Sequence, residues 1–281
     1  MRCLAITPLA AVAILLVSSG VSYAQPAPTQ GVDDDKLALI DNAVTDAIAD
    51  GQLPGAVVLV SHQGQTVYHK AFGHRILIPT PEPMTLDTVF DLASLTKVVA
   101  TTTAVMALVE EGRVRLRDPV AHYIPGFERH GKKAVTIEHL LTHTSGLRPD
   151  LPLEEEFSGY ATAIARAIDE RLVASPGTVF SYSDINFFVL GEVVARASGM
   201  QLDQFAQLRI FGPLEMRDTM FRPPVRLHPR IAATEACTPL GWPCGDPGAV
   251  MLRGIVHDPT ARRMGGGRGA RRPLCYGSRP R

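Results

Sequence analysis

The spacing of hydrophobic residues changes from a helical to a strand-like period along the first quarter of the chain. From Asp34 to about residue 50, apolar positions recur every three or four residues, which predicts an amphipathic helix. Two runs rich in β-branched and aromatic residues follow, at 56–61 and 66–72, and the turn between them at 62–65 indicates a hairpin. A hairpin followed by helices predicts an α+β fold whose sheet is completed by later strands.

A second apolar segment runs from about residue 94 to 111 and is closed by Gly112. It is hydrophobic on nearly every side, which is typical of a helix inside a protein. Further helices are expected at 136–142, 160–172, 184–198 and 202–210.

The first 24 residues have the pattern of a cleaved signal peptide. Arg2 is a short basic start, 9–17 is an apolar run, and Ser22-Tyr23-Ala24 offers small residues for cleavage. The alternative, a transmembrane anchor, needs about 20 apolar residues, and this run is shorter. We therefore expect export to the periplasm or beyond, residues 25–33 as a linker, and no transmembrane segment in the mature chain.

Composition and charge give information about domain size and about partners. Hydrophobic residues make up 46% of the 281 residues, charged residues make up 20%, and the formal net charge is zero. A chain of this length can bury a large core in one big domain or two modest ones. The charge balance gives no electrostatic reason to expect nucleic acid or an anionic membrane surface as a partner.

Three cysteines remain after the predicted signal peptide: Cys237, Cys244 and Cys275. In an oxidising compartment, Cys237 and Cys244 either close a small disulfide loop or remain two thiols. Zinc bound by cysteines and His257 is a sharper alternative, but the spacing matches no familiar zinc pattern. We therefore expect no metal.

The first candidate catalytic residues are Ser94 and Lys97. They form the only Ser-x-x-Lys in the chain and lie at the start of the predicted buried helix. Three residues make most of a helical turn, which brings the ammonium beside the hydroxyl. Lys97 can accept the serine proton, or hold its charge, if burial and neighbours lower the pKa of Lys97. Alternatively, Ser94 is a plain helix cap and Lys97 a solvated side chain, but a lysine at the head of an apolar helix needs a reason to be there.

A second candidate is Tyr182, in Tyr182-Ser183-Asp184, just before another apolar helix. A tyrosine there can place its phenolic oxygen opposite the serine and carry a proton to a leaving group. The alternative is that Tyr182 only packs.

Together, Ser94-Leu95-Thr96-Lys97 and Tyr182-Ser183-Asp184 resemble the serine β-lactamase and penicillin-binding-protein superfamily. Within it, the chain is most similar to the class C β-lactamase-like hydrolases, and 140–147 and Pro176-Gly177 agree with that likeness. The resemblance covers roughly 34–266. It implies a β-lactamase/transpeptidase-like α+β fold, with an antiparallel sheet flanked by helices and a mainly helical subdomain.

The resemblance also implies roles for these residues. Ser94 is the acylated nucleophile, Lys97 its activating base and Tyr182 the second proton carrier. Asp184 is a binding residue, in a place often filled by asparagine: it accepts hydrogen bonds from Lys97 but cannot donate an amide proton to a substrate.

The expected function is a serine hydrolase that forms an acyl-enzyme on a β-lactam, a D-Ala-D-Ala peptide or a small ester. The substrate is thus a small molecule or a peptidoglycan-like peptide, and neither a metal nor an organic cofactor is implied. The alternative is a non-catalytic pseudoenzyme or cell-wall-binding module. We expect His143 and His257 to be structural, and Ser145 is no lipase-type nucleophile because the chain has no Gly-x-Ser-x-Gly.

Residues 267–281 depart from the resemblance, which implies a third motif and closing strands after Gly266. The run is rich in arginine, glycine and proline, and one interpretation is a genuine disordered basic tail. Read after one skipped base, the degenerate codons of 267–276 permit a segment containing His-Ala-Gly, similar to the third motif. We therefore expect 34–266 to be a truncated domain followed by an out-of-frame tail, and the chain as written to fold poorly and to turn over little.

Overall fold

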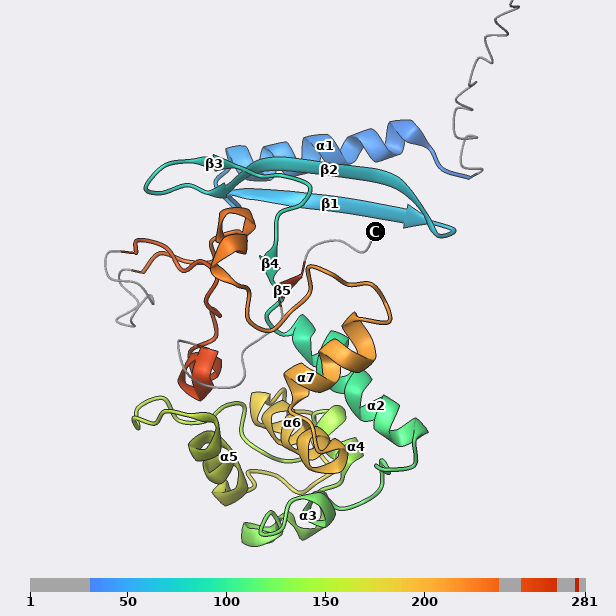
Figure 1. Cartoon of the computed structure of the whole chain (residues 1–281), viewed down its shortest axis with the longest axis vertical. Helices are drawn as coiled ribbons and strands as arrows, with labels where there is room; N and C mark the ends of the chain where they lie inside the picture. The colour runs from blue at the N-terminus through green and yellow to red at the C-terminus, as the bar shows by residue number, and fades with distance from the viewer. Residues whose placement is uncertain (1–30, 238–248, 267–275, 278–281) are drawn as a thin grey trace, which may run out of the picture.

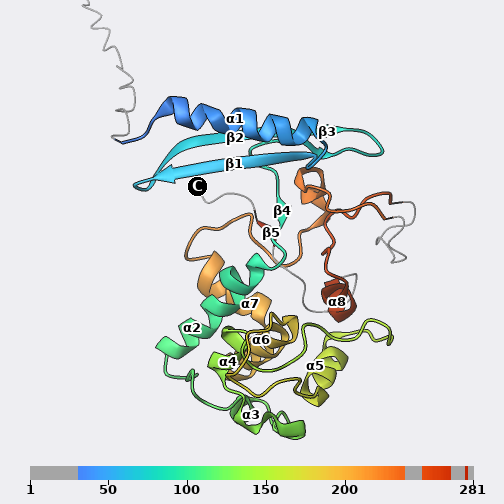
Figure 2. The ribbon, with the colours of Figure 1, turned by 180° about the vertical axis from the view of Figure 1, so that it is seen from behind.

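A computed structural model describes residues 31–237 and 249–266, and the backbone of 276–277. A sheet covered by one long helix lies at one end of the molecule, and a group of helices forms the other end (Figures 1 and 2). This arrangement confirms the predicted α+β class. The predicted signal peptide, residues 25–30 of the predicted linker and most of the 267–281 tail lie outside the described residues.

The sheet is built on the predicted hairpin. β1 (Gly55–His62) and β2 (Gln65–Ile76) are antiparallel, and β3 (Glu82–Pro83) adds to the other edge of β2. Gln63 and Gly64 form the turn with φ of 49° and 78°. Two positive φ values are what a two-residue type I′ turn requires, so the turn matches the twist of the strands.

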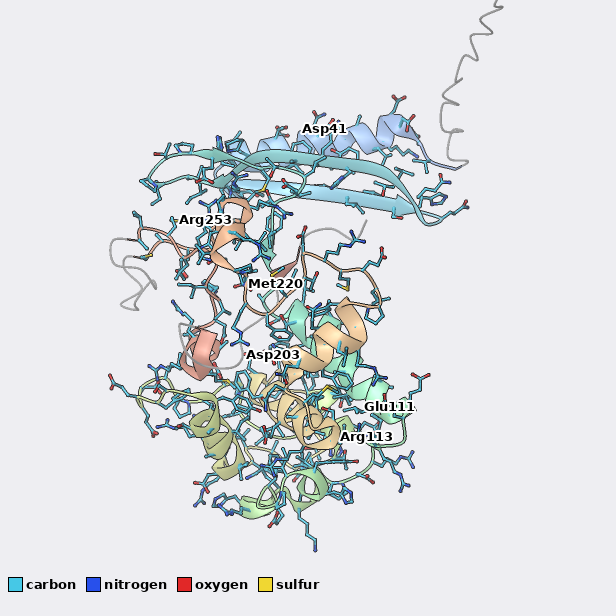
Figure 3. The ribbon with its side chains drawn as sticks, viewed as in Figure 1. Asp41, Glu111, Arg113, Asp203, Met220 and Arg253 are labelled. Atoms are coloured by element: carbon cyan, nitrogen blue, oxygen red, sulfur yellow. The ribbon has the colours of Figure 1, made fainter. Side chains whose placement is uncertain are left out.

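Helix α1 (Asp34–Ala49) lies along one face of the sheet (Figure 1). The Asp33 side chain caps its first turn. Its predicted apolar stripe is half-buried, and Asp41 on the same helix accepts hydrogen bonds from the Tyr68 hydroxyl and, at 2.6 Å, from Lys70, both in β2 (Figure 3). Apolar contact and these two polar bonds together dock α1 on the sheet.

The predicted buried helix is present, but its first part is wider than an α-helix. It consists of a π-helical stretch, η1 (Lys97–Thr102), followed by α2 (Thr103–Glu110). π-Helical turns occur frequently at functional sites. The helix ends as predicted at Gly112, whose φ is 71°, and the Arg113 N–H bonds the Leu108 carbonyl at 2.9 Å.

The main hydrophobic core lies in the helical part, around α2 and α6 (Asp184–Ser198). The predicted helix 184–198 is confirmed, 160–172 ends early at Asp169, and 202–210 divides into an α-helical and a π-helical part. The other helices of this part are α3 (Val120–Tyr123), η2 (Arg129–Ala134), α4 (Ile137–Leu141), α5 (Tyr160–Asp169), α7 (Leu202–Ala206) and η3 (Gln207–Phe211).

The sheet and the helical part meet at β4 (Phe90–Asp91), which lies just before Ser94 in the chain. β4 pairs with the backbone of β5 (Tyr276–Gly277). Beside β4, Val89 and Ile231 are fully buried and form a parallel bridge. The residues leading into Ser94 are therefore held at the junction of the sheet and the helices (Figure 1).

Residues 249–266 return along this junction after η4 (Val225–Arg230) and form α8 (Pro259–Ala261) and η5 (Arg262–Gly266). Arg253 ties them to β3 by a two-point ion pair with Glu82, at 2.9 and 2.6 Å (Figure 3). In the part of the chain that the structure describes, no helix has the length and hydropathy to cross a membrane.

Candidate active site

Ser94 is exposed at the end of a tight turn that leads from β4 into the central helix. Ala93 has a φ of 44°, which is uncommon for a residue with a Cβ and marks a constrained backbone. Asp91 holds the turn: its carboxylate accepts the Ala93 N–H and the His257 N–H, both at 2.9 Å. Among the described residues, the backbone N–H of Ser94 has no acceptor, so it is available to a ligand.

Lys97 contacts Ser94 as the spacing predicts. The Lys97 ammonium donates to Ser94 Oγ at 3.0 Å and pairs with Asp184 Oδ1 at 2.5 Å. Lys97 is only 8% exposed, so the alternative of a solvated lysine is wrong. Asp184 is the first residue of α6, and helix packing therefore brings the two motifs together.

The condition that burial and neighbours together lower the pKa of Lys97 is not met. Burial does lower that pKa, but the hydrogen bond and the charge of Asp184, with a contribution from Tyr182, outweigh it. The pKa of Lys97 therefore lies above its ordinary value, and the resting side chain is an ammonium.

Tyr182 lies against the same ammonium. Lys97 Nζ is 4.9 Å from the centroid of the Tyr182 ring and 5.7 Å from that of Phe187. The Tyr182 side chain is 44% exposed, so its phenol is open to a ligand while its ring face contacts the lysine. All four residues predicted for the site thus lie within one cluster.

Three carboxyl groups form a cluster beside Lys97, and sequence analysis anticipated only one of them. Oxygen atoms of Asp150, Asp184 and Asp258 all lie within 4.8 Å of one another. Burial raises the pKa of Asp150 to about 6, and the charges of Asp258 and Asp184 add to it, against hydrogen bonds from Thr260 and the Leu151 N–H. Burial also raises the pKa of Asp258. Burial, with the crowding of like charges added to it, therefore opposes ionisation of Asp150 and Asp258.

Replacing Asp150 by Asn is expected to stabilise the protein at alkaline pH. The pKa of Asp150 rises from 3.8 to about 6 on folding, so the folded state binds its proton more tightly. Stability is therefore lost as pH rises from about 4 to 6, and Asp150→Asn should recover about 1 to 3 kcal/mol at pH 8 and almost nothing at pH 4. Urea unfolding at the two pH values measures this difference. An equal effect at both would contradict the assignment.

A cavity of about 270 Å³ opens beside Ser94. Ser94, Lys97 and Asp184 line it. The lining also has many apolar side chains, including Phe187, Phe188, Leu202, Phe221 and Met264. The nucleophile candidate thus faces a space that holds a small ligand.

The sequence patterns did not predict Asp91, Asp150 and Asp258 as site residues. The role of Asp91 could have been predicted, because an aspartate side chain often accepts a hydrogen bond from the backbone N–H two residues later in a tight turn. Asp150 and Asp258 carry no local signal, since they reach the site only through packing. His257 pairs with Glu235 at 2.5 Å and also lines the cavity, so the structural role predicted for it stays a prediction.

Cys237 is disulfide-bonded. Cys244, its partner in one of the two alternatives that the sequence leaves open, lies outside the described residues, as does Cys275.

An exposed serine that contacts a buried lysine at the head of a central helix, beside an antiparallel sheet, defines a class of serine hydrolases that use lysine in place of histidine. A sequence profile of the beta-lactamase family matches residues 40–262. The chain therefore belongs to the β-lactamase family, within the serine β-lactamase and penicillin-binding-protein superfamily, whose members are serine hydrolases.

Individual relatives agree with this family. A Salmonella schwarzengrund protein named "Putative D-alanyl-D-alanine carboxypeptidase" is 32% identical over 226 residues, which cover 73% of this chain and 52% of that protein. The counterpart from Salmonella typhimurium is 31% identical over the same length. The chain thus spans about half the length of the curated relatives it matches.

Solved structures give the same fold. A class C β-lactamase superposes with a TM-score of 0.65 and 25% identity, over 74% of this chain and 58% of that one. The octameric penicillin-binding protein homologue from Pyrococcus abyssi superposes with a TM-score of 0.67 and 25% identity, over 86% and 53%. The predicted β-lactamase/transpeptidase-like fold is therefore confirmed.

Proposed function

We propose that this chain carries the nucleophile of a serine hydrolase that forms an acyl-enzyme at Ser94 with a β-lactam, a D-Ala-D-Ala peptide or a small ester, and that the chain as written turns its substrate over slowly. The observation that carries the proposal is the 3.0 Å contact between Ser94 Oγ and Lys97 Nζ. A serine hydroxyl is a weak nucleophile until a neighbouring group takes its proton, and Lys97 is the group in reach.

The raised pKa of Lys97 sets the order of proton transfers. When a substrate displaces water, the Lys97 ammonium passes a proton to Asp184, which lies 2.5 Å away. The reason is that an ion pair without water is no longer more stable than the neutral amine and carboxylic acid. The neutral amine then takes the Ser94 proton, and Ser94 Oγ bonds the carbonyl carbon. The free Ser94 N–H stabilises the oxyanion that forms.

Collapse of this intermediate breaks the bond to the leaving group, which receives its proton from the Lys97 ammonium through the phenol of Tyr182. Water then attacks the acyl carbonyl, with the same amine as base, and releases the acid and free Ser94. The contact of Tyr182 with Lys97 supports its part in this relay.

Covalent labelling tests the proposal. The full chain is incubated with a fluorescent penicillin and, separately, with a fluorophosphonate, and peptide mass spectrometry locates each adduct. Ser94 should carry the label from at least one probe, and Ser94→Ala should carry none at that peptide. A correctly folded chain that takes neither label would instead support the non-catalytic alternative, and labelling that survives Ser94→Ala would show that another residue reacts.

We also propose that the protein works outside the cytoplasm, in the periplasm or beyond. The predicted signal peptide at 1–24, the disulfide at Cys237 and the relatives named for D-alanyl-D-alanine, a cell-wall dipeptide, support this location.

A further inference from the structure

His143 lies directly against Tyr182. It is 9% exposed, and its ring is stacked on the Tyr182 ring with centroids 4.4 Å apart and an interplanar angle of 28°. Phe180 and Phe187 also surround it, with centroids at 6.0 and 5.2 Å. One face of the Tyr182 ring is therefore set by His143.

Two hydrogen bonds tie the neighbours of Tyr182 to the same histidine. The Ser181 N–H donates to the His143 carbonyl at 2.9 Å, and the Ser183 N–H donates to His143 Nδ1 at 3.0 Å. Ser183 is fully buried, so no water replaces its acceptor. The backbone on both sides of Tyr182 is thus fixed by one residue.

The second of these bonds requires a neutral imidazole. Because Nδ1 accepts, the ring proton sits on Nε2. Burial lowers the pKa of His143, the charge of Lys97 on η1 lowers it further, and Asp184 on α6 opposes them. The residue also has a φ of 56°, which histidine and asparagine adopt more readily than most residues.

We propose that His143 is a positioning residue for Tyr182: its Nδ1 and carbonyl hold residues 181–183 so that the phenol lies beside Lys97. The proposal rests on the proposed role of Tyr182 as a proton carrier. It goes beyond that role because it names the residue that places the phenol.

Two substitutions separate the hydrogen bond from the ring. His143→Asn tolerates the positive φ and offers Oδ1 in place of Nδ1, whereas His143→Phe keeps a stacking ring without an acceptor. We expect acylation of Ser94 to slow by about 10- to 100-fold in His143→Phe, since a buried N–H is left unpaired. His143→Asn should stay within about 10-fold of the wild-type chain because that N–H keeps an acceptor.

A double-mutant cycle with Tyr182→Phe distinguishes positioning from general stability. If His143 acts through Tyr182, His143→Phe costs little further acylation rate once the phenol is gone. Additive losses would overturn the proposal.

Hydrogen exchange provides a readout that does not depend on activity. The 178–184 segment should exchange faster in His143→Phe, but not in His143→Asn or Tyr182→Phe. Unchanged exchange in His143→Phe would overturn the positioning role of His143, whether or not Ser94 is acylated. Faster exchange in His143→Phe, in a chain that takes no label at Ser94, would contradict the proposed function but not the positioning role.

Discussion

Lys97→Met is expected to form the acyl-enzyme about 1,000-fold more slowly than the wild-type chain, the usual scale for loss of a general base. The Met side chain fills the space of the lysine stem but accepts no proton from Ser94, whose Oγ lies 3.0 Å from the ammonium. Stopped-flow labelling with the probe that the wild-type chain accepts measures the rate.

The same substitution also leaves Asp184 without its partner, so a folding defect must be separated from a chemical one. Removing one member of a buried pair is strongly destabilising, whereas removing both is often neutral. The double variant Lys97→Met/Asp184→Asn should therefore regain thermal stability without regaining acylation. If it regains acylation, Lys97 is not the base.

Asp184→Asn alone is the matched variant for the pH dependence. With Asp184 present, Lys97 passes its proton to that carboxylate when substrate binds, so the acylation rate should change little with pH around neutrality, although the pKa of Lys97 is raised. Without the carboxylate, the Lys97 ammonium must lose its proton to the solvent, so the acylation rate of Asp184→Asn should be low at neutral pH and increase toward alkaline pH. An Asp184→Asn rate that depends on pH no more than the wild-type rate would contradict the proton path through Asp184.

Gly146→Ala is expected to lower the free energy of unfolding by about 2 to 5 kcal/mol, combining backbone strain with steric overlap. Gly146 has a φ of 78°, and a Cβ placed on it would lie 2.0 Å from the Ala174 carbonyl oxygen. The two segments cannot separate easily, because the Val173 N–H bonds the Gly146 carbonyl at 2.8 Å. Thermal or urea unfolding of the purified variants measures the loss.

Gly199→Ala is the matched control. Gly199 has a nearly equal φ of 75° and no atom within 4 Å of the added Cβ, so only the backbone strain of about 1 to 2 kcal/mol applies. The difference between the two variants isolates the overlap with Ala174. Equal losses would show that residue 174 moves away from an added Cβ at residue 146 at little cost in free energy.

Local sequence patterns predicted the elements that depend on neighbouring residues. The helix from Asp34, the hairpin with its turn within 62–65 and the helix that begins at Asp184 were all confirmed. Each is specified by hydrophobic period and turn chemistry over a dozen or so residues. The contact of Ser94 with Lys97 belongs to the same group, because a spacing of three places both side chains on one face of a helical turn.

Tertiary structure decided the electrostatics of the site. The direction of the Lys97 pKa depends on Asp184, and the crowding of carboxyl groups depends on Asp150 and Asp258, all distant in sequence from Ser94. No periodicity encodes these distances. Burial and approach within a few ångströms set each charge, and both arise only when α6, η1 and the 249–266 segment pack together.

His143 shows the same division in a single residue. The sequence by itself marked it as structural, which agrees with its burial. Only the packed fold places its ring on Tyr182 and its Nδ1 on the Ser183 N–H. Local sequence patterns therefore predicted Ser94, Lys97, Tyr182 and Asp184 as candidates for the site. The fold decided which of them meet and in what charge state, because long-range packing sets both contact and burial.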